Sequence, residues 1–171
     1  EAGSDLVLTN TFGANLAALT EYDVVDRLAE ISEASARIAR ERADAHSTED
    51  KPRWVLGSMG PGTKLPSLAQ IGFAEIRDAY QRQVEAMILG GIDAVQIETC
   101  QDLLQAKAAV QAAKRARSAG GIDLPIFVNV TIETTGTMLL GTEIGAALTA
   151  LQPLGIDLIG LNLSLIHISE P

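Results

Sequence analysis

The sequence predicts an α/β fold in which parallel strands alternate with helices. Two observations favour this fold. About five apolar stretches of strand length alternate with four stretches of helical periodicity. Each predicted strand also ends in small or polar residues. Because right-handed crossovers keep such strands parallel, their carboxyl ends meet at one edge, where ligands bind in α/β proteins.

Composition limits the class of protein. The 171 residues are enough for one domain with a sizeable core, and the net charge of -9 disfavours nucleic acid as a partner. The single cysteine excludes an internal disulfide and fits a reducing compartment. With no apolar run of membrane-spanning length and no signal peptide, we expect a cytoplasmic protein without a membrane partner. The chain does not begin with methionine, so we expect its native start to be missing.

The first third of the chain predicts one strand and one helix. Residues 5–12 are apolar and then polar, as in a buried strand, and residues 13–15 form a turn. Asp23 is expected to cap a helix that runs to about Ala45. Its apolar face is expected to contain Leu28, Ile31, Ser35 and Ile38. Residues 46–53, with Pro52, are predicted to be a loop.

The next segment predicts a short strand, a glycine-rich loop and a helix. The strand covers residues 54–58, and the loop covers residues 57–62. The loop could hold an anion with its backbone N–H groups, or it could simply be a tight turn. A helix is predicted next, and it ends at Gly90 and Gly91. Its apolar residues at helical spacing are Phe73, Ile76, Tyr80, Val84 and Met87.

Residues 94–105 are predicted to be the central strand and the start of its helix. Glu98 lies at the carboxyl end of the strand, Asp102 is a suitable N-cap, and Gln105 would complete a capping box. The helix is expected to bury Leu103, Leu104, Val110 and Ala113. Its basic residues Lys107, Lys114, Arg115 and Arg117 indicate a solvated face.

The last third predicts two strands with a helix between them. The strands cover residues 125–132 and 158–163, with Asn162 at the far end of the second. Between them, residues 134–142 are expected to be a loop and residues 144–151 a helix.

Polar residues at the ends of these strands would share one rim. They are Thr9, Asn10, Thr11, Ser58, Glu98, Thr99, Asn129, Thr131 and Asn162. An open doubly wound sheet and a (β/α)8 barrel both fit the alternation, but a rim of this regularity favours the barrel. A barrel needs about 250 residues, so the prediction is an incomplete (β/α)8 TIM barrel of about five strand-helix units, without its first and last strands.

Four segments together carry a resemblance to a known family. They are VLTNTFGAN at 7–15, GSMGPGTKLPS at 57–67, IETCQDLLQAKAAV at 97–110, and VTIETTGTMLLGTEIGAALTALQPLGIDLIGLN at 130–162. The set resembles the homocysteine-binding domain of cobalamin-dependent methionine synthase. That family uses a (β/α)8 barrel in which three cysteines hold a zinc ion that binds the homocysteine sulfur. The thiolate attacks methylcobalamin, which another domain presents, and a further domain binds methyltetrahydrofolate.

The resemblance assigns roles to residues of this chain. Glu98 matches the glutamate that receives the amino group of homocysteine, and a carboxylate suits an ammonium group through charge-assisted hydrogen bonds. Phe12, Asn10 and Thr11 match the rim beside the substrate. Asn162 matches the asparagine before the first zinc-ligand cysteine.

The chain departs from the family at Leu163, where that cysteine is expected. Leucine has no lone pair for zinc, so this chain is not expected to assemble the metal site. We expect residues 1–163 to be a partial homocysteine-binding barrel domain and residues 164–171 to be a non-native tail, with cysteine at position 163 in the parent gene. His167 is an alternative metal ligand that lacks partners, and Cys100 is predicted to be a packing residue or spare thiol.

Three functional hypotheses follow. The first is an inactive fragment of methionine synthase, whose partners are homocysteine and the cobalamin- and folate-binding domains of the parent chain. The second is a stand-alone homocysteine S-methyltransferase that uses S-methylmethionine or a betaine. The third is a metal-free, non-catalytic binding module. The unpaired strand edges of an incomplete barrel also predict aggregation or partial unfolding.

Overall fold

The computed structural model describes residues 3–164, which form one parallel sheet. Its strands are β1 (Leu6–Leu8), β2 (Trp54–Met59), β3 (Ala94–Cys100), β4 (Ile126–Val130) and β5 (Leu158–Leu161). They are ordered β1-β2-β3-β4-β5 in the sheet, and each neighbouring pair is parallel. A doubly wound sheet reverses its order at a switch point, whereas a barrel wall keeps chain order. The order therefore agrees with the barrel type of α/β fold.

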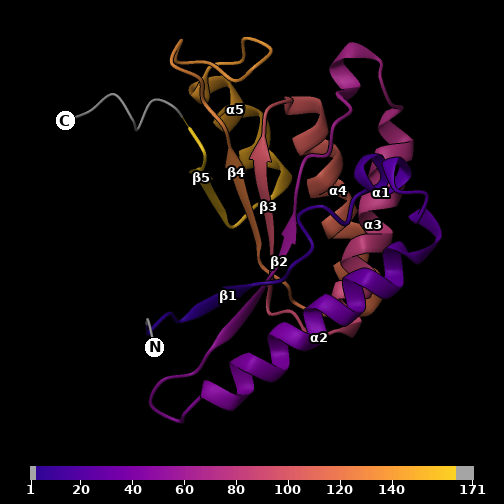
Figure 1. Ribbon diagram of the computed structural model, residues 1–171. Coiled ribbons are helices and arrows are strands. Elements are labelled where there is room, and N and C mark those ends of the chain that lie inside the picture. Colours follow the sequence, from indigo (N-terminus) through magenta and orange to yellow (C-terminus); the bar gives the residue numbers. More distant parts are fainter. Residues whose placement is uncertain (1–2, 165–171) are drawn as a thin grey trace.

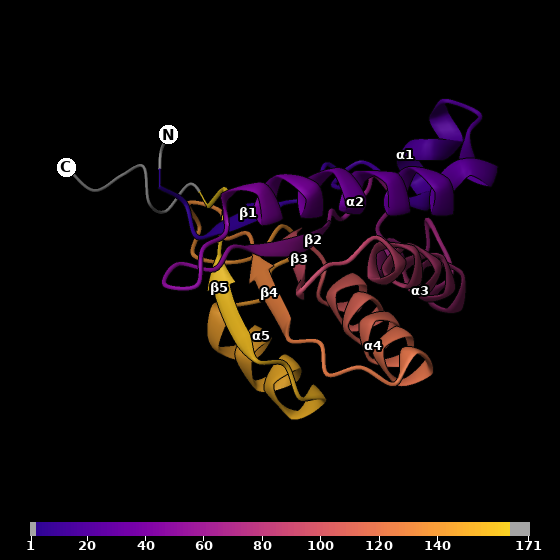
Figure 2. The ribbon, with the colours of Figure 1, turned by 90° about the horizontal axis from the view of Figure 1, so that it is seen from below.

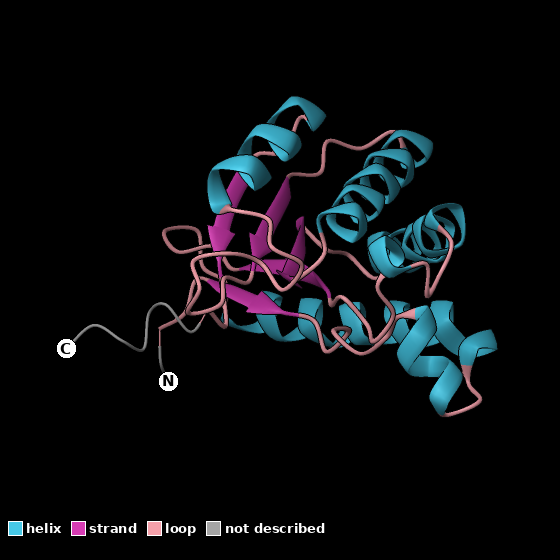
Figure 3. Cartoon of the chain, turned by 90° about the horizontal axis from the view of Figure 1, so that it is seen from above, coloured by secondary structure: helices cyan, strands magenta, loops and turns pink. Residues whose placement is uncertain are grey.

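Four helices of the described residues lie on one face of this sheet, and they are α2 (Leu28–His46), α3 (Phe73–Leu89), α4 (Leu103–Gly120) and α5 (Ile144–Leu151). The short helix α1 (Leu16–Glu21) packs against α3 instead. Figure 1 shows the strands and helices with their labels, and in the view from below α2, α3, α4 and α5 form an arc around the outside of the curved sheet (Figure 2). The opposite view shows the same arc from above (Figure 3). None of these helices is long and apolar enough to cross a membrane.

The core fills the space between the sheet and the helices. Alternate strand residues such as Val55, Ile97 and Val128 are buried there against α3 and α4. Their neighbours face the other side of the sheet, where Trp54 and Leu158 are each 47% exposed. The concave face of the sheet is thus only partly covered by the described residues.

Two helices lie where they were predicted, one begins later than predicted, and one was not predicted. The structure confirms α3 and α5 at their predicted positions, and the predicted apolar residues of α3 pack in the core. The expectation that Asp23 caps the second helix is wrong, because α2 begins at Leu28 after a short turn and Asp23 has a φ of 55°. Helix α1, which begins after the Asn15 cap, was not predicted.

The structure confirms Leu28 as a buried residue of α2, but the rest of the buried face differs from the prediction. Ile38 is 61% exposed, and the buried residues are Leu28, Ser32, Ala36, Ala39 and Ala43. Small side chains on this face allow α2 to approach α3 closely, since a Cβ added at Gly90 would lie 2.5 Å from the Ala36 Cβ. A prediction based only on large apolar side chains therefore misplaced most of the buried face of α2.

Three smaller corrections concern the first strand and the start of α4. The first strand ends at Leu8, well before the predicted Phe12, because the chain turns at residues 11–14 with a hydrogen bond from the Ala14 N–H to the Thr11 carbonyl. Asp102 caps α4 as predicted, but Gln105 donates to Pro61 instead of closing a capping box. Leu104, predicted to be core, is 36% exposed.

Candidate functional site

The candidate site is centred on Glu98, a half-buried carboxylate at the carboxyl end of β3. Its Oε1 accepts a hydrogen bond from the Ser58 hydroxyl, 2.5 Å away on β2. Its Oε2 lies 3.4 Å from the Asn162 side-chain amide, which follows β5. The predicted rim thus brings residues from three strands to one carboxylate.

Ser58 is held in turn by two threonines that follow β1. Its N–H donates to the Thr9 hydroxyl at 2.9 Å, and its carbonyl accepts from the Thr11 hydroxyl at 2.6 Å. The two threonine hydroxyls are 2.6 Å apart, and Gln83 of α3 donates to the Thr11 carbonyl at 2.9 Å. Because Thr11 is fully buried and its hydroxyl also faces the Met87 sulfur, it supports Ser58 from the helix side.

The other two residues predicted from the first strand lie on the surface of the rim. Asn10 is exposed, and Phe12 is 42% exposed. The Phe12 ring packs over Gly60, where an added Cβ would lie 2.9 Å from the Phe12 Cγ. Phe12 therefore gives the loop after β2 an apolar neighbour that remains open to solvent.

The glycine-rich loop after β2 is tied down mainly through its carbonyl oxygens. The Tyr80 hydroxyl donates to the carbonyls of Gly60 and Pro61 at 3.1 Å, and Gln105 also donates to Pro61. Gly62 has a φ of 71°, which a tight turn requires of glycine. These contacts favour the tight-turn interpretation over a cradle of N–H groups for an anion.

Asp102 fastens the far part of the same loop to α4. Its buried carboxylate accepts from the Ser67 N–H at 2.8 Å and from the Ser67 hydroxyl at 2.6 Å. It also accepts from the N–H groups of Leu104 and Gln105, at 2.8 and 3.4 Å. One carboxylate therefore caps the helix and fixes the loop that borders the site.

The described residues do not provide a donor set for zinc. Across residues 3–164, no group of three or more His, Cys, Asp or Glu side chains is placed to hold a metal ion. Burial, with smaller contributions from Asp102 and Glu98, raises the pKa of the Cys100 thiol to about 12, and a protonated thiol is a poor ligand. Leu163 is 72% exposed with a φ of 47°. His167 lies outside the described residues.

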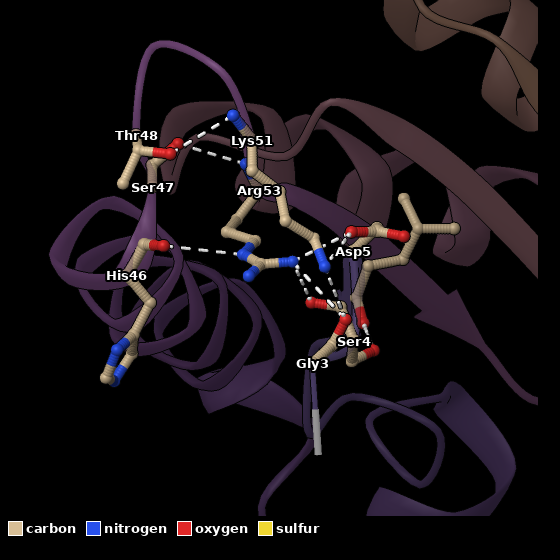
Figure 4. Close-up of polar contacts among 9 residues, drawn as sticks. Gly3, Ser4, Asp5, His46, Ser47, Thr48, Lys51 and Arg53 are labelled. Carbon is tan, nitrogen blue, oxygen red and sulfur yellow. Dashed lines mark hydrogen bonds and ion pairs between the residues drawn. The ribbon is translucent and has the colours of Figure 1, made fainter. Parts of the chain in front are cut away.

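A second candidate is a cavity of about 510 Å³ at the start of β1, lined by residues 3–7 and by Arg42, Ala43, His46 and Arg53. Figure 4 shows how Arg53 fastens this region, with hydrogen bonds to the Ser4 carbonyl at 2.7 Å and the Asp5 carboxylate at 2.8 Å. Lys51 also pairs with Asp5, at 3.4 Å. Because its Arg53 is engaged in this way and it lies at the opposite end of the strand, we place the functional site at Glu98.

Comparison with known proteins gives one family. The family model described as homocysteine S-methyltransferase matches residues 1–171. Methionine synthases from Mycobacterium tuberculosis (strain ATCC 25618 / H37Rv) and Mycobacterium leprae (strain TN) are each 57% identical over 162 residues, which is 95% of this chain. The chain spans only 14% and 13% of the length of these relatives.

Solved structures show the same type of fold. The metallated form of the homocysteine methyltransferase MmuM from Escherichia coli matches with a TM-score of 0.69 and 19% identity, over 94% of this chain and 58% of that chain. The apo form of the same enzyme matches with a TM-score of 0.60 and 20% identity. At this identity the likeness concerns the fold alone.

Proposed function

This chain belongs to the homocysteine S-methyltransferase family, and from that premise we propose that it is the homocysteine-binding part of a methionine synthase, with Glu98 as the acceptor for the substrate's amino group. The observation that carries the proposal is the position of the Glu98 carboxylate. It lies on the rim, and each of its oxygens is held by one donor, from Ser58 and from Asn162. Since a carboxylate offers about four lone-pair positions, acceptor capacity remains for an ammonium group.

Binding would follow from simple chemistry. The α-ammonium of homocysteine is charged at neutral pH and forms charge-assisted hydrogen bonds with a carboxylate. The exposed face of Phe12 would cover the methylene chain of the substrate, beside Asn10. Thr11 would act indirectly by holding Ser58, because its own hydroxyl is buried.

We do not propose that this chain activates the homocysteine sulfur by itself. The metallated E. coli enzyme supports a metal in the family, and we propose that the parent enzyme uses zinc together with methylcobalamin and methyltetrahydrofolate bound by its other domains. Residues 3–164 bring no three His, Cys, Asp or Glu side chains together to hold that metal. We therefore propose that the chain as given binds homocysteine without methylating it. Sequencing the parent gene beyond Asn162 tests whether cysteine, and not Leu163, is native.

The sheet would be one part of a larger barrel. The chain covers 58% of the E. coli enzyme, and its strands keep barrel order. Leu6, Leu8, Trp54 and Leu158, each 47% exposed, would become the interior of a closed barrel. Residues 1–163 are accordingly proposed as a partial domain.

Among the alternatives, identity favours methionine synthase. The chain is 57% identical to methionine synthases and 19% identical to the E. coli homocysteine methyltransferase. A stand-alone enzyme is therefore the second candidate.

Calorimetric titration with L-homocysteine tests the proposal. The variant Glu98→Gln keeps the shape of the side chain but removes its charge, so we expect binding at least about tenfold weaker than in the unchanged chain. Equal affinity of the two proteins would refute the role of Glu98.

A further inference from the structure

Asn162 reaches across β4 to a distorted part of β3. The pairing of β3 with β4 shifts between Ile97 and Cys100, where the strand contains a bulge. Within it, Thr99 has a φ of 60°. A β-branched residue rarely adopts this left-handed conformation, so the surrounding structure must hold it there.

The Asn162 side chain makes the contacts that hold it. Its Oδ1 accepts the Thr99 N–H at 2.9 Å, and its Nδ2 donates to the Thr99 hydroxyl at 3.0 Å. The same Nδ2 lies 3.4 Å from the Glu98 Oε2. The amide presents an acceptor and a donor on two separate atoms, whereas aspartate lacks the donor and alanine lacks both.

Asn162 is itself fixed from β4. Its backbone N–H donates to the Val130 carbonyl at 3.3 Å, and its carbonyl accepts from the Thr131 hydroxyl at 3.0 Å. Glu98 is therefore contacted from both sides. Ser58 on β2 donates to its Oε1, and Asn162, which follows β5, contacts both Thr99 in the bulge and the Glu98 Oε2.

We propose that Asn162 is a positioning residue for ammonium recognition, which acts by fixing Thr99 and thereby the direction of the Glu98 carboxylate. This inference rests on the proposed function, because it assumes that Glu98 receives the amino group of homocysteine. It assigns Asn162 an effect on selectivity for the amino group and no required contact with the substrate.

The test compares two probes in each variant. They are L-homocysteine and 4-sulfanylbutanoate, which lacks only the amino group, and their affinities for the full chain are measured by titration calorimetry. The ratio of the two affinities does not depend on the fraction of protein that is folded, since both probes bind the same folded molecules. A role in folding alone would leave this ratio unchanged.

In Asn162→Ala and Asn162→Asp we expect the preference for homocysteine over the analogue to fall about tenfold, with binding of the analogue within about twofold of the unchanged chain. The control is Gln111→Ala. It also removes a side-chain amide, at an exposed position of α4 that makes no hydrogen bond to Glu98 or Thr99 among the described residues. The control is expected to keep the preference.

The outcomes separate the two claims. If the unchanged chain shows no preference for homocysteine, the proposed function fails. If it shows the preference and Asn162→Ala retains it, or if Gln111→Ala loses it equally, the positioning role of Asn162 is refuted.

Discussion

Replacing Asp102 with alanine would remove the group that joins the loop after β2 to α4. The substitution removes the N-cap, which costs about 1 kcal/mol, and two hydrogen bonds from Ser67 to a buried charge, each worth about 1.5 kcal/mol or more. Because such terms are not strictly additive, we expect the free energy of unfolding to fall by about 3 to 4 kcal/mol.

Urea denaturation followed by circular dichroism measures this loss. For an m-value of about 2 kcal/mol/M, the midpoint should move down by about 1.5 to 2 M. Asp123→Ala, at an exposed position in the loop before β4, is the control and should change stability by less than about 0.5 kcal/mol. A loss below about 1 kcal/mol in Asp102→Ala, with an unchanged m-value, would refute the view that this carboxylate fixes the loop.

Three further results are expected. Burial raises the pKa of Cys100 from 9.0 to about 12, so the unfolded chain loses this proton at a lower pH than the folded chain. The free energy of unfolding should therefore fall between pH 9 and pH 12, by at most about 1.4 kcal/mol per pH unit. Cys100→Ala should show a shallower decline, and an equal decline would contradict the assignment. Gly90→Ala should lower the free energy of unfolding by about 1 to 3 kcal/mol in a urea titration, because its Cβ would lie 2.6 Å from the Glu33 carbonyl. Gly120→Ala, whose Cβ would come no closer than 3.7 Å to the nearest side chain, that of Ile122, should be neutral or stabilising. Leu8, which is 47% exposed, lies on the edge strand β1, and Leu8→Lys should reduce self-association as measured by light scattering. An unchanged chain that is monodisperse and melts cooperatively would contradict association through this unpaired strand edge.

The parts of the fold that follow from local pattern could be predicted. Alternating apolar segments predicted the order and direction of the strands, and β2, α3 and α5 lie where the periodicity placed them. The polar ends of the strands predicted that Ser58, Glu98 and Asn162 would share a rim, and their hydrogen bonds confirm that they lie together.

The remainder depends on tertiary contacts that no short pattern contains. Alanines of α2 are buried in preference to Ile38 because close approach to α3 matters more than side-chain size. Thr11 belongs to the interior because the chain already turns at residues 11–14, which periodicity did not predict. The left-handed Thr99 is hydrogen-bonded to Asn162, 63 residues away in the sequence.

The most direct test of the account is a crystal structure of this chain soaked with L-homocysteine. We predict that the substrate nitrogen lies within about 3.2 Å of a Glu98 carboxylate oxygen, with Ser58 and Asn162 still hydrogen-bonded to that carboxylate. Homocysteine bound elsewhere, such as in the cavity beside Arg53, or bound at the rim with its nitrogen directed away from Glu98, would contradict the central claim.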